Sequence, residues 1–148
     1  MHAFQRALVP AISDIWWSML SNRIVELPMQ AYDEVPFVVG GVRLIGNAQA
    51  TVVFSCGERL AREAAASMFD ISVADVSDAE IRDAVAELTN VAAGNLRGLL
   101  PGAHGLSLPT VVNRNEQRAH LVRGQPVAQC AFASHAGAFT VAVYEGPE

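Results

Sequence analysis

The feature that most constrains the fold is a long amphipathic helix with signals at both of its ends. Ser77-Asp78-Ala79-Glu80 has the spacing of a capping box, in which a serine and a glutamate satisfy free N–H groups of a first helical turn. Pro101-Gly102 stops a helix, so the spacing predicts one over about residues 78–100. On a helical wheel its apolar residues fall within about 60° of arc, which predicts a single buried stripe. That stripe consists of Ile81, Val85, Leu88, Ala92, Leu96 and Leu99.

The face opposite this stripe is formed by Asp83, Glu87, Asn90, Gly94 and Arg97. Glu87 and Asn90 are three residues apart, so their side chains are neighbours. An exposed glycine such as Gly94 costs about 1 kcal/mol relative to alanine in a helix, and close approach of a partner is one reason to keep it. The pattern also fits an ordinary solvated face, and both interpretations stay open here. Asn95 lies near the apolar edge, where we expect its amide to tie the helix to a neighbouring segment.

The residues before this helix predict a β-hairpin followed by another helix. Residues 37–45 and 49–54 are rich in β-branched side chains, and the Gly46-Asn47 pair between them favours a hairpin. Ser55-Cys56-Gly57-Glu58 also has the form of a capping box, so we expect a helix to start directly after the second strand. Beyond the long helix, further strands are predicted over residues 108–112, 126–133 and 138–144.

The N-terminal segment has helical spacing, with Leu8, Ile12, Ile15 and Met19 on one stripe. Pro10 suits a helix start better than a helix interior, so we expect the regular part to begin near it. Trp17 points about 100° away from Trp16. Two interpretations stay open for Trp17: it contacts a partner, or a loop covers it.

The order of elements predicts the fold class. A helix, two strands, two helices and then two or three strands indicate an α+β fold, with an antiparallel or mixed sheet and the two central helices packed on one face. The chain has 148 residues, of which 51% are apolar and 17% charged. That length and composition are typical of a single globular domain, here residues 1–148.

Composition excludes some partners. All ten basic residues are arginines, they face fifteen acidic residues, and they form no basic cluster, which argues against nucleic acid as a ligand. No stretch approaches the roughly 18 apolar residues of a membrane span, and the N-terminus lacks the pattern of a signal peptide. We therefore expect a cytoplasmic protein with no membrane partner. Cys56 and Cys130 are expected to be reduced, largely buried thiols.

Two other chemistries find no support. The four histidines show no ligand spacing with one another or with the cysteines, so no metal site is predicted; they are His2, His104, His120 and His135. No G-x-S-x-G motif of a serine hydrolase occurs. We expect His104 to be a loop residue and Ser107 to be a turn or strand-start hydroxyl.

Asp83, Glu87 and Asn90 are followed by the pair Gly94-Asn95 and, later, by Pro109 within Ser107-Leu-Pro-Thr-Val-Val112. This pattern resembles the signature helix of the CheC/CheX/FliY chemotaxis phosphatases. The segments FSCGERLAREAAASMF and AQCAFASHAGAFTVAVYE are also similar to that family, so the resemblance covers nearly the whole chain. The single signature copy is similar to CheX rather than to two-site CheC, and a CheC-like fold is implied.

The resemblance implies a phosphatase that acts on the phosphoaspartate of a CheY-like response-regulator receiver domain. Asn90 would orient the attacking water, and Glu87 would anchor the receiver through its lysine. Asp83, Gly94 and Arg97 would contact the partner. Mg²⁺ is expected on the receiver, and no cofactor is expected on this chain. A homodimer joined through sheet edges is implied too, with Trp17 as a second candidate contact.

Two departures from the family pattern leave an alternative open. The 18 positions between Asn90 and Pro109 are fewer than the CheC pattern has, which concerns the predicted loop around residues 101–106. Arg97 stands where lysine is frequent, which keeps the charge but changes the donor geometry. The alternative is a non-catalytic CheX-like module that binds a receiver domain or a flagellar-switch component.

Overall fold

The computed structural model describes residues 3–29, 36–113 and 124–146. Within these residues, seven strands form one sheet in the order β1-β6-β7-β3-β2-β4, and β5 pairs with β2 as well. Every pairing is antiparallel. The strands are β1 (Val25–Leu27), β2 (Val38–Gly46), β3 (Ala50–Cys56), β4 (Ala103–Leu106), β5 (Thr110–Asn113), β6 (Ala128–Ser134) and β7 (Gly137–Glu145).

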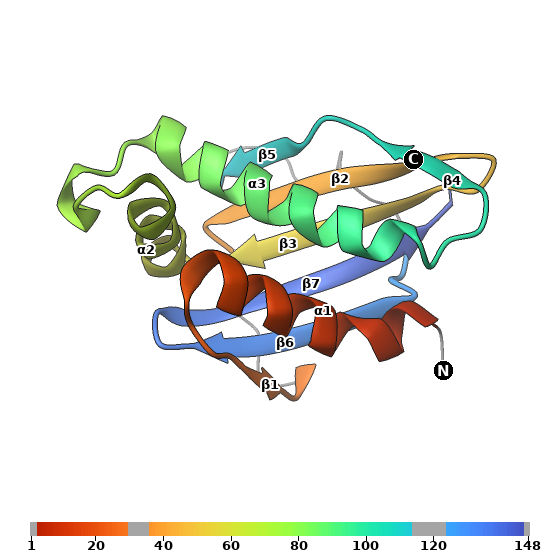
Figure 1. The fold of residues 1–148 in the computed structure, drawn as a ribbon, viewed down its shortest axis with the longest axis horizontal. Helices are drawn as coiled ribbons and strands as arrows, with labels where there is room; N and C mark the ends of the chain where they lie inside the picture. The colour runs from red at the N-terminus through yellow and green to blue at the C-terminus, as the bar shows by residue number, and fades with distance from the viewer. Residues whose placement is uncertain (1–2, 30–35, 114–123, 147–148) are drawn as a thin grey trace.

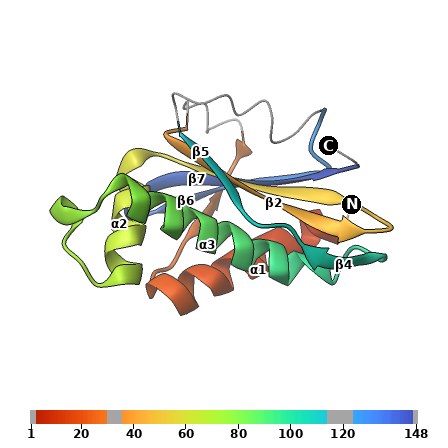
Figure 2. The ribbon, with the colours of Figure 1, turned by 90° about the horizontal axis from the view of Figure 1, so that it is seen from above.

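In the described part of the chain, three α-helices cover one face of this sheet. They are α1 (Ala3–Leu20), α2 (Glu58–Phe69) and α3 (Asp78–Arg97), and a short 3₁₀ helix η2 (Val73–Asp75) precedes α3. Figure 1 shows α1 and α3 running across the sheet, with α2 at one end. Figure 2 shows all three helices on the same side. The predicted α+β class, with its two central helices on one face, is confirmed, and the N-terminal helix shares that face.

The core lies between the helices and the sheet. Trp16 of α1 stacks on Phe139 of β7 with ring centroids 4.2 Å apart, and Phe132 of β6 lies 5.1 Å from Phe139. Cys56 and Cys130 are buried and unpaired by disulfides, as predicted. Burial raises the pKa of both thiols, so neither is an activated nucleophile.

The hairpin of β2 and β3 forms as predicted, with Val42 opposite Val52. Its turn needs Gly46, which has φ +153°, and an added Cβ there would collide with the carbonyl oxygen of Gly102. The predicted capping box at residues 55–58 is wrong. Ser55 and Cys56 stay in β3 because they pair with both β2 and β7, and Gly57 starts α2 without a side-chain cap.

Two other boundaries differ from the predictions. Helix α1 starts at Ala3 and runs through Pro10, because Phe4 and Leu8 are buried and hold its first turns on the core. Helix α3 ends at Arg97, and the N–H groups of Leu99 and Leu100 turn back to carbonyls three residues earlier. Leu99 is therefore exposed rather than part of the buried stripe.

Two strands were not predicted. β1 is a three-residue strand on β6, and β4 forms where a loop was expected around residues 101–106. Both are short. β1 has only three residues, fewer than the four to eight over which alternation of apolar and polar residues marks a half-buried strand, and β4 (Ala-His-Gly-Leu) does not alternate regularly. Trp17 is exposed and lies under the guanidinium of Arg23, 5.1 Å from the ring centroid. Within the described residues, no loop covers it.

Candidate functional site

Helix α3 carries the predicted site, and its start is fixed as the sequence predicts. The hydroxyl of Ser77 accepts a hydrogen bond from the N–H of Glu80 at 3.2 Å. The carboxylate of Glu80 accepts one from the N–H of Ser77 at 2.8 Å. This reciprocal capping box satisfies two N–H groups that a helix start otherwise leaves free.

The depth of α3 on the sheet is set by a contact with β2. Thr89 is fully buried, and its hydroxyl donates to the carbonyl of Val85 at 2.7 Å. An added Cβ at Gly40 of β2 would collide with that hydroxyl oxygen. The glycine therefore lets the helix lie close to the strand. With Thr89 facing the sheet, Asn90 lies about 100° further round the helix.

The outward face of α3 opens into a hollow of about 530 Å³. Its lining includes Asp83, Glu87 and Asn90 of α3, together with Pro109 from the segment before β5. Ala86 of α3 and Phe69, the last residue of α2, complete the lining. The structure thus brings four residues of the predicted signature into one surface feature, although Pro109 is far from the others in sequence.

The polar groups of this hollow are available to a partner. Asp83 and Glu87 are exposed and Asn90 is half-buried. Within the described ranges, none of these three side chains has a hydrogen-bond or ion-pair partner. A half-buried amide has one side open to solvent and to whatever docks there. The hollow can therefore accept a cationic group at its carboxylates and a water or polar group at its amide.

Pro109 reaches the hollow because the chain before β5 is fastened to β2. The N–H of Ser107 donates to the carbonyl of Arg43 at 2.9 Å, and the Ser107 hydroxyl accepts from the N–H of Arg43 at the same distance. Thr110 then pairs with Gly41. Ser107 lies in the connection between β4 and β5, so it is not the first residue of a strand. The short segment after Asn90 is sufficient to bring Pro109 beside the helix.

Arg82 fastens the other end of the same region. Its guanidinium donates to the carbonyl of Val111 in β5 at 2.8 Å. This hydrogen bond links the first half of α3 to the strand that follows Pro109. The two elements that line the hollow are therefore joined by a charge-assisted contact as well as by packing.

Gly94 and Arg97 lie further along the same helix, and neither lines the hollow. Both are exposed. An added Cβ at Gly94 would meet no described atom closer than the Cδ1 of Leu106, at 4.0 Å. Packing within the described chain therefore does not require this glycine. The prediction for Asn95 is wrong: the residue is exposed, and within the described residues its amide ties no segment to the helix.

The sequence did not reveal Ala86 or Phe69 as part of a site, and the larger of the two is Phe69. It is 40% exposed, although it is a large aromatic residue. Its sequence signal is weak, because an apolar residue at the end of a helix usually packs into the core. The placement of α2 beside α3 determines that Phe69 faces the hollow instead.

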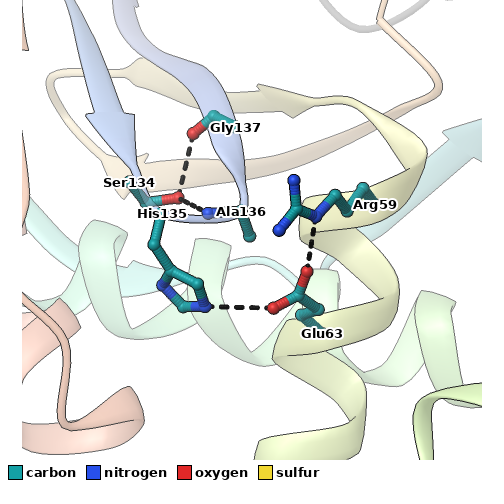
Figure 3. A network of polar contacts seen from close by, with 6 residues as sticks. All are labelled: Arg59, Glu63, Ser134, His135, Ala136 and Gly137. Carbon is teal, nitrogen blue, oxygen red and sulfur yellow. Dashed lines mark hydrogen bonds and ion pairs between the residues drawn. The ribbon is translucent and has the colours of Figure 1, made fainter.

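The two histidines in the described residues lie outside the hollow. His104 is exposed in β4 rather than in a loop, and His2 and His120 fall outside the described residues. His135 contacts Glu63 at 3.0 Å, and Glu63 also accepts a hydrogen bond from Arg59 at 2.8 Å (Figure 3). In the described part of the chain, no group of three or more His, Cys, Asp or Glu side chains is placed to hold a metal ion.

A membrane-spanning helix is also missing from the described ranges, since none of their helices has the length and hydropathy to cross a bilayer.

Comparison with known proteins identifies the family. Residues 38–133, more than half of the chain, match the family described as Chemotaxis phosphatase CheX. A comparison with curated proteins found no significant match. The matched stretch begins in β2 and ends in β6, so it contains all of α3 and the segment with Pro109.

Solved structures share the fold over nearly the whole chain. CheX from Desulfovibrio desulfuricans has a TM-score of 0.74 at 19% identity, covering 97% of this chain and 99% of that one. CheX from Vibrio vulnificus has a TM-score of 0.75 at 18% identity, covering 97% of each chain. CheX in the CheX–CheY–BeF₃–Mg²⁺ complex from Borrelia burgdorferi has a TM-score of 0.71 at 14% identity, covering 99% of this chain and 100% of that one. On the strength of the sequence match, with which the shared fold agrees, this protein belongs to the chemotaxis phosphatase CheX family.

Proposed function

We propose that this protein hydrolyses the aspartyl phosphate of a CheY-like receiver domain. The observation that carries the proposal is the hollow in which Glu87 and Asn90 lie without a partner from the described residues. Membership in a family of chemotaxis phosphatases supports the reaction class. The structural neighbour from Borrelia burgdorferi, solved with CheY, BeF₃ and Mg²⁺, supports the class of partner.

Asn90 is the proposed catalytic residue. Hydrolysis of an aspartyl phosphate needs a water held in line with the breaking bond, and the protein's main task is to position that water. The side-chain carbonyl of Asn90 accepts a hydrogen bond from the water and stays uncharged beside the anionic phosphoryl group. A carboxylate at this position would repel the phosphate. The half-buried setting of Asn90 suits an amide that enters the partner's site.

Glu87 is the proposed anchor. Its carboxylate is exposed at the same hollow, one turn of helix from Asn90. A charge-assisted hydrogen bond from a lysine of the receiver to Glu87 would fix the register in which Asn90 meets the phosphate. Three further residues are proposed to contact the partner: Asp83 inside the hollow, and Gly94 and Arg97 further along the same helix. Mg²⁺ bound by the receiver would neutralise the phosphoryl oxygens, and this chain is proposed to bind no cofactor.

The test measures dephosphorylation of a phosphorylated CheY-like receiver at several receiver concentrations. Asn90→Ala is expected to lower kcat about 100-fold, because the water loses its orientation. Glu87→Ala is expected to raise KM about tenfold, the equivalent of one lost charge-assisted hydrogen bond. Asn95→Ala is the matched control, an exposed asparagine on the same helix. An unchanged kcat in Asn90→Ala would contradict the proposed mechanism.

The same assay separates the catalytic proposal from the non-catalytic binding module. A wild-type protein that binds the phosphorylated receiver and leaves its hydrolysis rate at the unstimulated value is a binding module. A wild-type protein that raises the rate, with Asn90→Ala losing the increase while still binding, is a phosphatase.

A further inference from the structure

Two exposed apolar residues lie in the hollow or next to it in the chain. Phe69 lines it and is 40% exposed. Leu108 directly precedes Pro109, which lines it, and Leu108 is 88% exposed, more than any other large apolar residue in the described ranges. An exposed leucine by itself needs no explanation. The position of Leu108 does need one, because its neighbour Pro109 shares a hollow with unpartnered carboxylates and an amide.

Leu108 is held on an ordered backbone. Ser107 before it exchanges two hydrogen bonds with Arg43 of β2, and the Ser107 hydroxyl also donates to the carbonyl of Leu108 at 3.0 Å. Pro109 after it has a fixed φ. A partner that buries Leu108 therefore does not have to order the backbone that carries it, which removes part of the entropic cost of binding.

Phe69 is held in a comparable way at the other segment. It ends α2, and the following Asp70 takes a left-handed conformation with φ +55°. The N–H of Ile71 then returns to the carbonyl of Ala66 at 3.1 Å. This closure of the helix end fixes the direction of the chain at Phe69, so its ring is presented at the hollow instead of being free to fold back.

We infer that Phe69 and Leu108 are docking residues that bind the receiver domain beside its phosphorylation site and set its affinity. The inference rests on the proposed function, because it places the same partner on the same hollow. The polar residues are expected to supply only part of the affinity, since the contribution of exposed charge pairs is modest. Protein interfaces gain most of their affinity from a few residues that become fully buried on binding, and the polar groups around them give specificity.

The charges of the hollow favour a receiver domain over a second copy of this chain as the occupant. Asp83 and Glu87 are acidic and unpaired within the described residues, so a symmetric contact would bring like charges together. A receiver that offers a lysine beside its phosphate complements them. The preferred partner surface is therefore a basic group flanked by apolar side chains.

The experiment measures two quantities for each variant. One is the binding of a receiver activated with BeF₃⁻ and Mg²⁺, and the other is the KM and kcat of phosphoreceiver hydrolysis. Leu108→Ala and Phe69→Ala are each expected to weaken binding and raise KM about tenfold, with kcat within about twofold of wild type. Raising the salt concentration should weaken the contact of Glu87 and leave the effect of Leu108→Ala unchanged.

Trp17→Ala and Val25→Ala are the matched controls, since both residues are large, apolar and exposed but lie on α1 and β1. Leu108 is so exposed that its truncation leaves the core intact. If Phe69→Ala lowers the stability of the protein, the Leu108→Ala variant alone tests the inference. Unchanged binding and KM in Leu108→Ala, with an active wild type, would overturn the inference and leave the proposed function standing. A wild type that binds through Leu108 without accelerating hydrolysis would overturn the proposed function and support the inference. Loss of self-association instead of receiver binding would overturn the inference in favour of a second copy.

Discussion

Thr89 of α3 packs directly on Gly40 of β2, so closely that a single added methyl group at Gly40 would meet its hydroxyl oxygen. Thr89 precedes Asn90, the proposed catalytic residue. The contact that sets the depth of the helix in the core therefore also sets how far the proposed catalytic amide stands out from the sheet. Neither Gly40 nor Thr89 touches the hollow, and both act through the position of the helix.

Gly40→Ala is expected to lower the free energy of unfolding by about 1–3 kcal/mol, the usual cost of overpacking a core. The added Cβ would also lie 3.0 Å from a methyl of Val85, so the helix has to shift. Urea denaturation measures the effect. The control is Gly98→Ala, where φ is −63° and an added Cβ has no neighbour within 4 Å. Combining Gly40→Ala with Thr89→Ala should recover part of the loss, and no recovery would contradict the contact as its cause.

Gly94→Ala is expected to stabilise the protein by about 0.5–1 kcal/mol, because alanine is a better helix former and the added Cβ has room. Docking of the receiver is expected to weaken at the same time, since a side chain now stands where the partner approaches. Thermal melts and receiver binding measure the two effects. Gly94→Gln should weaken docking further, and Asn95→Ala should not. Unchanged receiver binding in Gly94→Gln would show that the partner does not approach this part of α3.

Gln5→Leu is expected to cost about 1–2 kcal/mol of stability. The side-chain amide of Gln5 donates to the carbonyl of Gln129 at 3.1 Å and accepts from the N–H of Gln129 at 2.9 Å. It thereby pairs the backbone of β6 at a residue that β1 does not reach. Without the Gln5 amide, this stretch of the β6 edge is free to pair with another chain. Chemical denaturation measures the stability, with Asp14→Ala on the same helix as control.

The sheet-edge homodimer implied by the family resemblance stays a prediction, and Gln5 offers a way to test it. If wild-type protein dimerises through this part of the β6 edge, the amide of Gln5 has to be displaced, so Gln5→Leu should strengthen dimerisation. Sedimentation at several concentrations measures this. A weaker dimer in Gln5→Leu would contradict the use of this edge.

The Glu63 contacts predict a pH dependence of stability. The hydrogen bond from Arg59, followed by that with His135, lowers the pKa of Glu63 below its ordinary value of 4.5. A lowered carboxyl pKa contributes stability above pH 4.5, and this contribution is lost as the pH falls through the folded-state pKa. Near neutral pH, the free energy of unfolding of wild type should thus exceed that of Glu63→Gln by less than about 1 kcal/mol.

Thermal melts from pH 7 to pH 3 check this difference, which should shrink below pH 4.5. Glu87→Gln removes a carboxylate that has no partner in the described chain and serves as the control for net charge. A difference between wild type and Glu63→Gln that stays constant across this range would contradict the assignment.

Much of the fold could be predicted because its signals are local. The capping box at Ser77, the apolar spacing of α3 and the Gly46-Asn47 turn each act within a few residues, and the structure confirms all three. Where a local helix-capping signal overlapped a strand, the strand pairing determined the structure. Ser55 could cap a helix, but its strand partners on both sides keep it in β3. The end of α3 and the exposure of Asn95 were missed because helical spacing alone does not locate the edge of the core.

The sequence by itself determined the α+β class, the helix with Glu87 and Asn90 on its outward face, and the pattern that includes Pro109. The family match supports that pattern, and the roles of its residues remain proposals. Only the tertiary structure decided that Pro109 and Phe69 meet those residues in one hollow, because their placement depends on hydrogen bonds to β2 and on the packing of α2 beside α3. The depth of the helix also depends on a glycine in another strand, and a contact between residues 40 and 89 leaves no periodic signal in either segment.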